Sequence, residues 1–234
     1  MRLHRFFVNS PIEYTKTIIK DEQLIHQWRN IFRYNVGSEV ILFDGSGMEY
    51  DAVIEKMNNR EAELRLVSER KGILPDKKII LFQSLIKKDK MEWVVEKATE
   101  LGVFKIVPTI SERSEKKSFN LERARKIAIE ASEQCGRADV PEICEIQKLE
   151  ITLNTAIVAD SVIVFYPTPP PSPLPLARGG GTASSVSIFI GPEGGWTENE
   201  IKKFKDLNIK IFSLGNLTLR TETAAIVALT KIIF

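Results

Sequence analysis

Apolar positions follow two different periods along the chain. Between residues 38 and 70 they gather in three short runs suited to β-strands, at 39–43, 49–54 and 62–67. The segments between these runs, 44–47 (DGSG) and 58–59 (NN), have the residue types of tight turns. Because strands this close in sequence pair with their neighbours, the pattern predicts a small antiparallel barrel over the first 70 or so residues.

Beyond Gly72, strand-like runs alternate with runs of helical period. Strands are expected at 79–85, 103–107, 162–165, 186–190 and 209–214, with Pro108 ending the second of them. Helices are expected at about 91–101, at 120–136, after residue 197 and from about residue 221. Two capping-box pairs mark helix starts, Asp89 with Glu92 and Thr197 with Glu200. This alternation predicts a mostly parallel sheet covered by helices on both faces.

One stretch, 167–185, fits neither pattern. It contains six prolines, which lack a backbone donor, and three consecutive glycines at 179–181. We interpret it as an exposed, poorly ordered loop insertion, and we expect 169–181 to be dispensable because a flexible loop's closure cost changes slowly with its length.

Composition narrows the function classes. Lys and Arg (33) nearly balance Asp and Glu (31), so any surface that binds nucleic acid has to be local. Two cysteines and two histidines are too few for a disulfide framework or a structural zinc site, so no metal is expected. Since no window is apolar enough to span a bilayer, we expect a cytoplasmic protein without membrane attachment.

Two loops lie where α/β proteins bind ligands, between the carboxyl end of a strand and the start of a helix. The first, 191–195 (GPEGG), has glycines that allow backbone to approach a ligand closely, but taken alone it is better interpreted as an ordinary turn. In the second, 214–220 (LGNLTLR), Arg220 directly precedes a helix N-terminus. A cation is unfavourable there unless it pairs with Glu222 or an anionic ligand. The position of Arg220 therefore indicates that this residue has a functional role.

These loops with their flanks, 190–200 and 214–225, resemble the cofactor signature of the RsmE family, whose members methylate N3 of a uridine in 16S ribosomal RNA. Similar motifs extend over nearly the whole chain, at 2–7, 37–45, 83–102, 106–114 and 130–141. Two features depart from the family. Leu217 occupies a position that is usually Arg, and relatives usually have a shorter loop in place of 167–185.

The resemblance implies an α/β fold of the SPOUT class, with a trefoil knot, preceded by a small PUA-like β-barrel. The expected domains are an RNA-binding barrel at 1–72 and a SPOUT methyltransferase domain at 73–234. The resemblance also implies that S-adenosylmethionine is the cofactor and that 16S rRNA of the small ribosomal subunit is the partner. The implied assembly is a homodimer. Cofactor contacts are expected from both loops and the following helix start, namely Gly191, Pro192, Glu193, Gly194, Gly195, Leu214, Gly215, Asn216, Leu219, Thr221, Thr223 and Ala224.

Methylation at N3 of uridine requires loss of a proton and stabilisation of a developing negative charge. We expect Arg220 to stabilise this charge and Glu222 to orient Arg220, although a structural Arg–Glu bridge is an equally good interpretation. Glu193 is a candidate base, but a carboxylate that holds loop backbone is the preferred interpretation. RNA contacts are expected from basic and polar residues at the amino terminus and in 83–137, namely Arg2, Arg5, Gln83, Lys87, Lys90, Arg113, Gln134 and Arg137.

The sequence leaves two alternatives open. One is an enzyme of the same class that acts on another rRNA or tRNA nucleotide. The other is a noncatalytic RNA-binding protein of ribosome assembly that keeps the fold; binding of S-adenosylmethionine distinguishes it from an enzyme.

Overall fold

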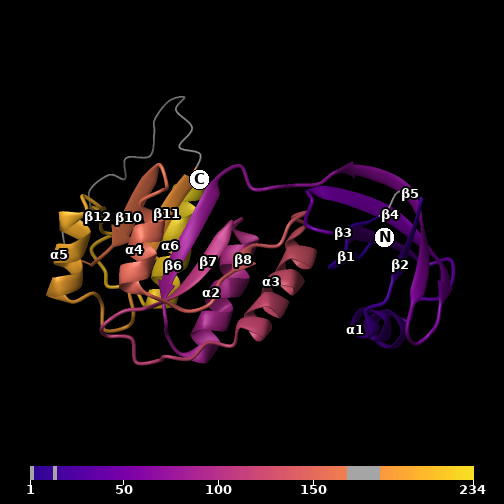
Figure 1. Ribbon diagram of the computed structural model, residues 1–234, viewed down its shortest axis with the longest axis horizontal. Helices are drawn as coiled ribbons and strands as arrows, with labels where there is room; N and C mark the ends of the chain where they lie inside the picture. Colours follow the sequence, from indigo (N-terminus) through magenta and orange to yellow (C-terminus); the bar gives the residue numbers. More distant parts are fainter. Residues whose placement is uncertain (1–2, 13–14, 168–184) are drawn as a thin grey trace. The chain divides into compact units, whose positions relative to one another are not determined.

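The computed structural model describes residues 3–12, 15–167 and 185–234, which form two compact units (Figure 1). The first unit contains Met1–Leu74 together with Ser132–Val140, and the second contains Pro75–Ala131 and Pro141–Phe234. The division expected from the sequence, 1–72 and 73–234, did not include the return of Ser132–Val140 to the first unit.

The first unit is built on a five-stranded sheet. The strand order is β1 (Arg5–Phe7), β3 (Glu39–Phe43), β4 (Met48–Met57), β5 (Ala62–Lys71) and β2 (Lys16–Ile19). The three expected strands are present, but the sheet is not purely antiparallel, because β1 pairs with β3 in parallel. Strands β1 and β2 stand at opposite ends of the order, so the described strands form an open sheet rather than a hydrogen-bonded closed barrel.

A short helical segment, absent from the sequence prediction, covers the core of the first unit. Helix α1 (Glu22–His26) continues directly into a π-helical turn, η1 (Gln27–Ile31). Asp21 caps α1 by accepting hydrogen bonds from two backbone N–H groups of the first turn, at 2.9 and 3.1 Å. Trp28 of η1 is completely buried and packs edge-on against Phe6 at 5.3 Å. This segment was missed because it is too short to show a helical period.

The second unit contains a seven-stranded sheet in which every pair is parallel, which confirms the expected architecture. The order is β12 (Lys210–Phe212), β10 (Ser161–Phe165), β11 (Ser185–Ile190), β6 (Lys78–Ser84), β7 (Lys105–Ile110) and β8 (Glu142–Ile143), with β9 (Gln147–Lys148) also beside β7. Five of these strands match sequence predictions. The two-residue strands β8 and β9 had no pattern of their own.

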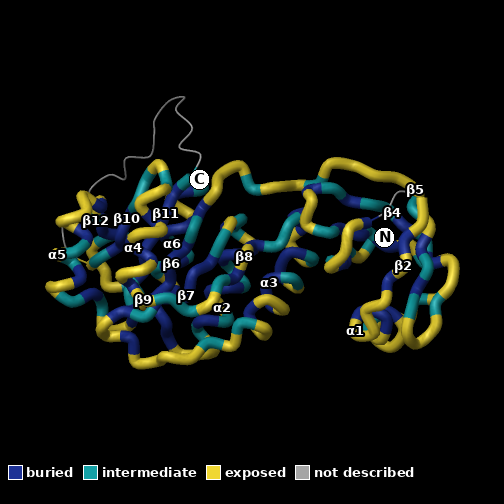
Figure 2. Tube along the Cα trace, viewed as in Figure 1, coloured by how far each residue is buried: buried dark blue, intermediate teal, exposed yellow. Residues whose placement is uncertain are grey.

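Helices cover this sheet on both faces (Figures 1 and 2). The helices that follow β6 along the chain are α2 (Lys88–Glu100), α3 (Leu121–Cys135), α4 (Leu149–Ala156), α5 (Glu198–Asp206) and α6 (Thr221–Ile233). On one face, α4 and α5 pack with strand residues such as Phe82 and Phe189, which stack at 4.6 Å. Helices α2 and α6 pack together, and α6 contacts β11. They lie on the opposite face of the sheet, because successive residues of a strand point to opposite faces. Helix α4 was not expected from the sequence.

Two local predictions about strand and helix ends were wrong. Strand β7 continues through Pro108 to Ile110. Pro108 pairs with Gln83 of β6 on one side, but on the other side it lies opposite the interval between β8 and β9, where no strand residue needs its missing N–H. Helix α2 begins at Lys88 with no side-chain cap, so the Asp89–Glu92 capping box does not form. The other box is confirmed, since Thr197 and Glu200 exchange side-chain and backbone hydrogen bonds at the start of α5.

The stretch 167–185, the expected insertion, joins two parallel neighbours, β10 and β11, and its residues 168–184 lie outside the described residues. Phe165 pairs with Ile190, so the chain has to return about 17 Å to reach the start of β11 at Ser185. Any linker between the two strands therefore has to span this distance, and the insertion itself stays a prediction.

This crossover predicts a minimum linker length. Replacing 168–184 with ten Gly/Ser residues should leave the melting temperature within a few degrees of wild type. Joining Pro167 directly to Ser185 leaves about 10 Å of chain between Phe165 and Ser185 and should abolish cooperative unfolding of the second unit. Thermal unfolding by circular dichroism compares the two. A cooperative transition in the direct junction would contradict the crossover argument.

Candidate functional site

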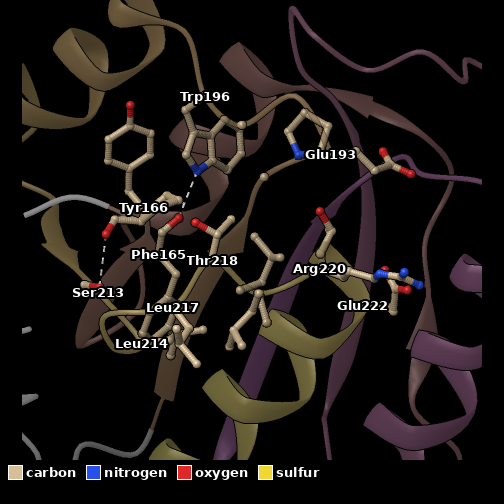
Figure 3. Close-up of a pocket in the computed structure, with 18 of the residues that line it drawn as sticks. Phe165, Tyr166, Glu193, Trp196, Ser213, Leu214, Leu217, Thr218, Arg220 and Glu222 are labelled. Carbon is tan, nitrogen blue, oxygen red and sulfur yellow. Dashed lines mark hydrogen bonds between the residues drawn. The ribbon is translucent and has the colours of Figure 1, made fainter.

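A cavity of about 570 Å³ lies where β10, β11 and β12 end (Figure 3). Three adjacent parallel strands end at the same edge of the sheet, so the loops that follow them converge there. The cavity is lined by residues after β10, after β11, after β12, at the start of α6, and by Lys87 and Lys90. This is the position at which open α/β sheets bind ligands.

The loop after β11 is fixed by a close contact between Gly191 and Trp196. A Cβ atom at Gly191 would lie 3.1 Å from the Trp196 indole, so a larger residue would displace that ring. The indole N–H of Trp196 donates to the backbone oxygen of Phe165 at 3.1 Å, which ties this loop to the end of β10 (Figure 3). The glycine is therefore explained by packing of loop against loop.

The loop after β12 is held by Ser213. Its hydroxyl donates to the backbone oxygen of Gly215 at 2.9 Å and lies 3.3 Å from the backbone oxygen of Pro167 (Figure 3). Gly215 has a φ of +148°, which L side chains rarely adopt. One hydroxyl thus joins the ends of β10 and β12 and shapes the cavity between them.

The structure corrects the expected pairing of Arg220 with Glu222. Glu222 forms an ion pair with Lys90 instead, with 3.1 Å between Lys90 Nζ and Glu222 Oε1. Within the described residues, Arg220 is exposed and has no ion pair or side-chain hydrogen bond, so the alternative structural bridge is not formed either. A cation at a helix N-terminus is electrostatically unfavourable. The nearby Glu222 carboxylate attracts Arg220 without forming an ion pair, and an anionic ligand can compensate the charge further.

Glu222 is ionised at neutral pH. Burial of the carboxyl group opposes ionisation, but its own backbone N–H at the helix start, Lys90 and Arg220 outweigh burial. Together they lower the pKa of Glu222 below its ordinary value of 4.5. The cavity therefore combines two cations, Lys90 and Arg220, with a mostly buried carboxylate.

Glu193 and Arg113 hold the loop after β11 in place. Glu193 is exposed, and its Oε1 accepts from the backbone N–H of Lys87 at 3.5 Å, which agrees with the backbone-holding interpretation. Arg113, an expected RNA contact, donates from Nη1 to the backbone oxygen of Gly194 at 2.8 Å. Its guanidinium remains exposed, so holding this loop does not prevent a phosphate contact.

Most of the expected cofactor residues meet in the cavity. Those that line it are Gly191, Pro192, Glu193, Gly195, Leu214, Gly215, Leu219, Thr221 and Ala224, whereas Gly194, Asn216 and Thr223 do not. Lining residues that the sequence did not indicate are Phe165, Tyr166, Pro167, Ile190, Trp196, Ser213, Leu217 and Thr218. The end of β10 could have been found by noting that a third parallel strand ends beside the other two. Leu217, the departure from the family pattern, is 81% exposed at the rim.

The expected RNA contacts separate into accessible and buried residues. Lys87 and Lys90 line the cavity, and Gln134 is exposed on α3. Gln83 is completely buried, with its amide nitrogen 3.0 Å from the backbone oxygen of Ser84, so it does not face solvent. Arg2 lies outside the described residues.

Two arginines expected to contact RNA are buried in ion pairs of the first unit, which corrects their assignment. Arg5 Nη1 is 2.6 Å from Glu49 Oε1, and the two side chains are only 9% and 6% exposed. Arg137 is 4% exposed and pairs with Asp139 at 2.8 Å. Buried, paired guanidinium groups stabilise the fold and cannot reach a phosphate without breaking these pairs.

Residues 74–233 match the family described as the RNA methyltransferase domain, and residues 29–67 match the RNA methyltransferase PUA domain. The chain is 29% identical to the ribosomal RNA small subunit methyltransferase E of Rickettsia conorii, over 99% of this chain and 96% of that protein. A putative methyltransferase from Legionella pneumophila, solved in complex with S-adenosylmethionine, is 28% identical with a TM-score of 0.89, and covers 99% of this chain and 97% of that one.

The ribosomal RNA small subunit methyltransferase E from Neisseria gonorrhoeae, solved with bound S-adenosylmethionine, is 27% identical with a TM-score of 0.85. It covers 98% of this chain and 96% of that one. These similarities confirm the fold class expected from the sequence. Among the described residues, no helix is long and apolar enough to cross a membrane, and no three His, Cys, Asp or Glu side chains are grouped to hold a metal.

Proposed function

The chain belongs to the ribosomal RNA small subunit methyltransferase E family, and from this premise we propose that it transfers the methyl group of S-adenosylmethionine to N3 of a uridine in 16S rRNA. The observation that carries the proposal is the cavity at the ends of β10, β11 and β12, with the unpaired Arg220 at its edge. The same observation disfavours a noncatalytic RNA-binding role, for which no such cavity is needed.

The cavity fits S-adenosylmethionine in size and chemistry. Its volume of about 570 Å³ lies within the range of small-molecule sites. Apolar side chains such as Ile190, Leu214 and Leu219 can enclose the adenosine, while backbone groups of the two glycine-containing loops are available for its polar edges. When bound, this cofactor supplies an activated methyl group on a sulfonium. The residues of the chain hold it in line with the base and exclude water.

The target uridine requires electrostatic stabilisation during the reaction. N3 of uridine carries a proton, and its loss leaves a negative charge delocalised over O2 and O4. Arg220 is exposed beside the cavity, and no described residue forms an ion pair or a side-chain hydrogen bond with its guanidinium. It is therefore suited to stabilise that charge as the methyl group moves.

The RNA partner, the location and the oligomeric state belong to the same proposal. The proposed partner is 16S rRNA of the small ribosomal subunit, and the proposed assembly is a homodimer, as the resemblance implies. The proposed location is the cytoplasm. Exposed Lys87 and Arg113 in the second unit support a role in binding RNA phosphates. Light scattering on the purified protein tests for the dimer.

Methyl transfer to ribosomal particles tests the proposal directly. Purified protein and labelled S-adenosylmethionine should modify small subunits from a strain that lacks this protein, and mass mapping should place the methyl group on N3 of one uridine. Naked 16S rRNA is the comparison substrate. Incorporation into neither would overturn the proposal, and a product at another nucleotide would favour the alternative target.

The contact between Gly191 and Trp196 gives a prediction for cofactor binding. Gly191→Ala should weaken S-adenosylmethionine binding about tenfold, or about 1.4 kcal/mol, because the indole has to move from a wall of the cavity. Isothermal titration calorimetry measures the affinity, and thermal unfolding checks that the variant folds. Unchanged affinity would show that the indole can shift without altering the cavity.

A further inference from the structure

Three charged side chains, Lys90, Glu222 and Arg220, lie together in the cavity, and Glu222 interacts with both cations. We propose that Glu222 accepts the N3 proton of the target base, while Lys90 and Arg220 donate to the carbonyl oxygens on either side of N3. The three side chains would then select uracil as well as activate it. This inference rests on the proposed function and supplies its proton acceptor and its basis of base selection.

Glu222 is the better placed of the two carboxylates that line the cavity in the described part of the chain. Glu193, the other, is exposed and contacts only a backbone N–H at 3.5 Å. Glu222 is 8% exposed, stands in the first turn of α6 and is held by Lys90 at 3.1 Å. A general base has to be held within hydrogen-bond reach of the proton that it removes, and Glu222 is the more firmly fixed.

The three side chains are complementary to the Watson–Crick edge of uracil. That edge presents, in order, the acceptor O4, the donor N3–H and the acceptor O2. A carboxylate between two cations presents the opposite order of donor, acceptor and donor. Cytosine has an unprotonated N3, which would place one acceptor against the carboxylate of Glu222. Polar groups left unpaired in this way are a strong basis for rejecting a base.

The proposed reaction is a proton transfer to Glu222 followed by a methyl transfer to N3. An oxygen of Glu222 takes the proton, the N3–H bond breaks, and its electron pair stays on the base, where the charge spreads to O2 and O4. N3 then forms a bond to the methyl carbon as the carbon–sulfur bond breaks, and that bond's electron pair stays on sulfur. The sulfonium becomes a neutral thioether. The proton on Glu222 leaves to water after the product departs.

Lys90 has a second role in this scheme, because besides donating to the base it fixes the carboxylate of Glu222 and keeps it ionised. The charged groups that face the cavity around Glu222 are Lys90 and Lys87 from the start of α2, Arg220 from the loop before α6, and Glu193 from the loop after β11. Lys90 and Arg220 lower the pKa of Glu222, which burial alone would raise. Removing Lys90 therefore should raise that pKa.

The test compares Glu222→Gln with Glu150→Gln in single-turnover methyl transfer to small subunits across pH. Glu150 is a matched control, because it also pairs with a lysine, at 2.6 Å from Lys203, and has a lowered pKa, but lies outside the cavity. Glu222→Gln should lower the rate about a hundredfold at neutral pH. This deficit should shrink about tenfold per unit of rising pH, as uridine loses its N3 proton unaided. Glu150→Gln should follow wild type throughout.

Lys90 variants give a second readout that does not depend on Glu222→Gln folding. Lys90→Ala should move the acidic limb of the pH–rate profile to higher pH, whereas Lys90→Arg should leave it near wild type. A Glu222→Gln deficit that is constant with pH, or an unmoved limb in Lys90→Ala, would overturn the inference. Failure of wild type to methylate N3 of a uridine would instead overturn the proposed function.

Discussion

Replacing Arg220 with Ala should lower the single-turnover rate of methyl transfer by a factor between about a hundred and a thousand. The guanidinium is exposed at the cavity and forms no ion pair or side-chain hydrogen bond among the described residues, so in the proposed reaction it is free to stabilise the negative charge that develops on the base. Removal of one preorganised electrostatic contact has an effect of this size. Arg220→Lys should recover little of the rate, because a point charge cannot replace a planar guanidinium that donates along two directions.

The stability of the Arg220 variant separates catalysis from structure. Because a cation is unfavourable at the start of α6, Arg220→Ala should leave the melting temperature unchanged or raise it slightly. Lys231, an exposed cation in the last turn of the same helix, is the matched control. Lys231→Ala should cost about 0.3–1 kcal/mol of stability and leave the rate at wild type. A normal rate in Arg220→Ala, whatever its stability, would remove Arg220 from the catalytic machinery.

Replacing Arg5 with Ala should destabilise the protein by about 3 kcal/mol, although the sequence suggested an RNA contact. Arg5 and Glu49 form a buried pair at 2.6 Å, and Arg5 also donates to the backbone oxygen of Arg137 at 3.2 Å. Loss of Arg5 leaves the Glu49 carboxylate buried with fewer partners. We expect a loss of stability at the low end of the range known for broken buried ion pairs, because Arg70 still pairs with Glu49 at 2.9 Å.

Arg65→Ala is the control for this prediction. Arg65 pairs with Glu55 at 3.0 Å on the same sheet, but these side chains are 54% and 40% exposed. An exposed pair contributes less than about 1 kcal/mol, so urea unfolding should distinguish the two variants clearly. If Arg5 instead contacted RNA, Arg5→Ala would unfold like wild type and would reduce the salt dependence of RNA binding.

Local sequence determined the elements whose signals lie within a few residues. The box of Thr197 with Glu200, the parallel strands and the two cavity loops follow from periodicity, capping and glycine placement, and each is present. Arg220 directly precedes α6, as the sequence indicated, because this position depends only on the residue and the helix that follows it. These features depend on contacts within one turn or one strand, which sequence spacing specifies directly.

Only the tertiary structure decided which distant groups meet. The sequence could not show that Glu222 pairs with Lys90, that Arg5 is buried against Glu49, or that the end of β10 completes the cavity. Pro108 likewise stays within a strand because of a gap between two other strands. Side-chain partners are set by strand order and by the burial that it imposes, and identical residues pair differently when the sheet brings other neighbours to them. Charge type and loop position are therefore readable from this chain's sequence, whereas partners and accessibility are properties of its fold.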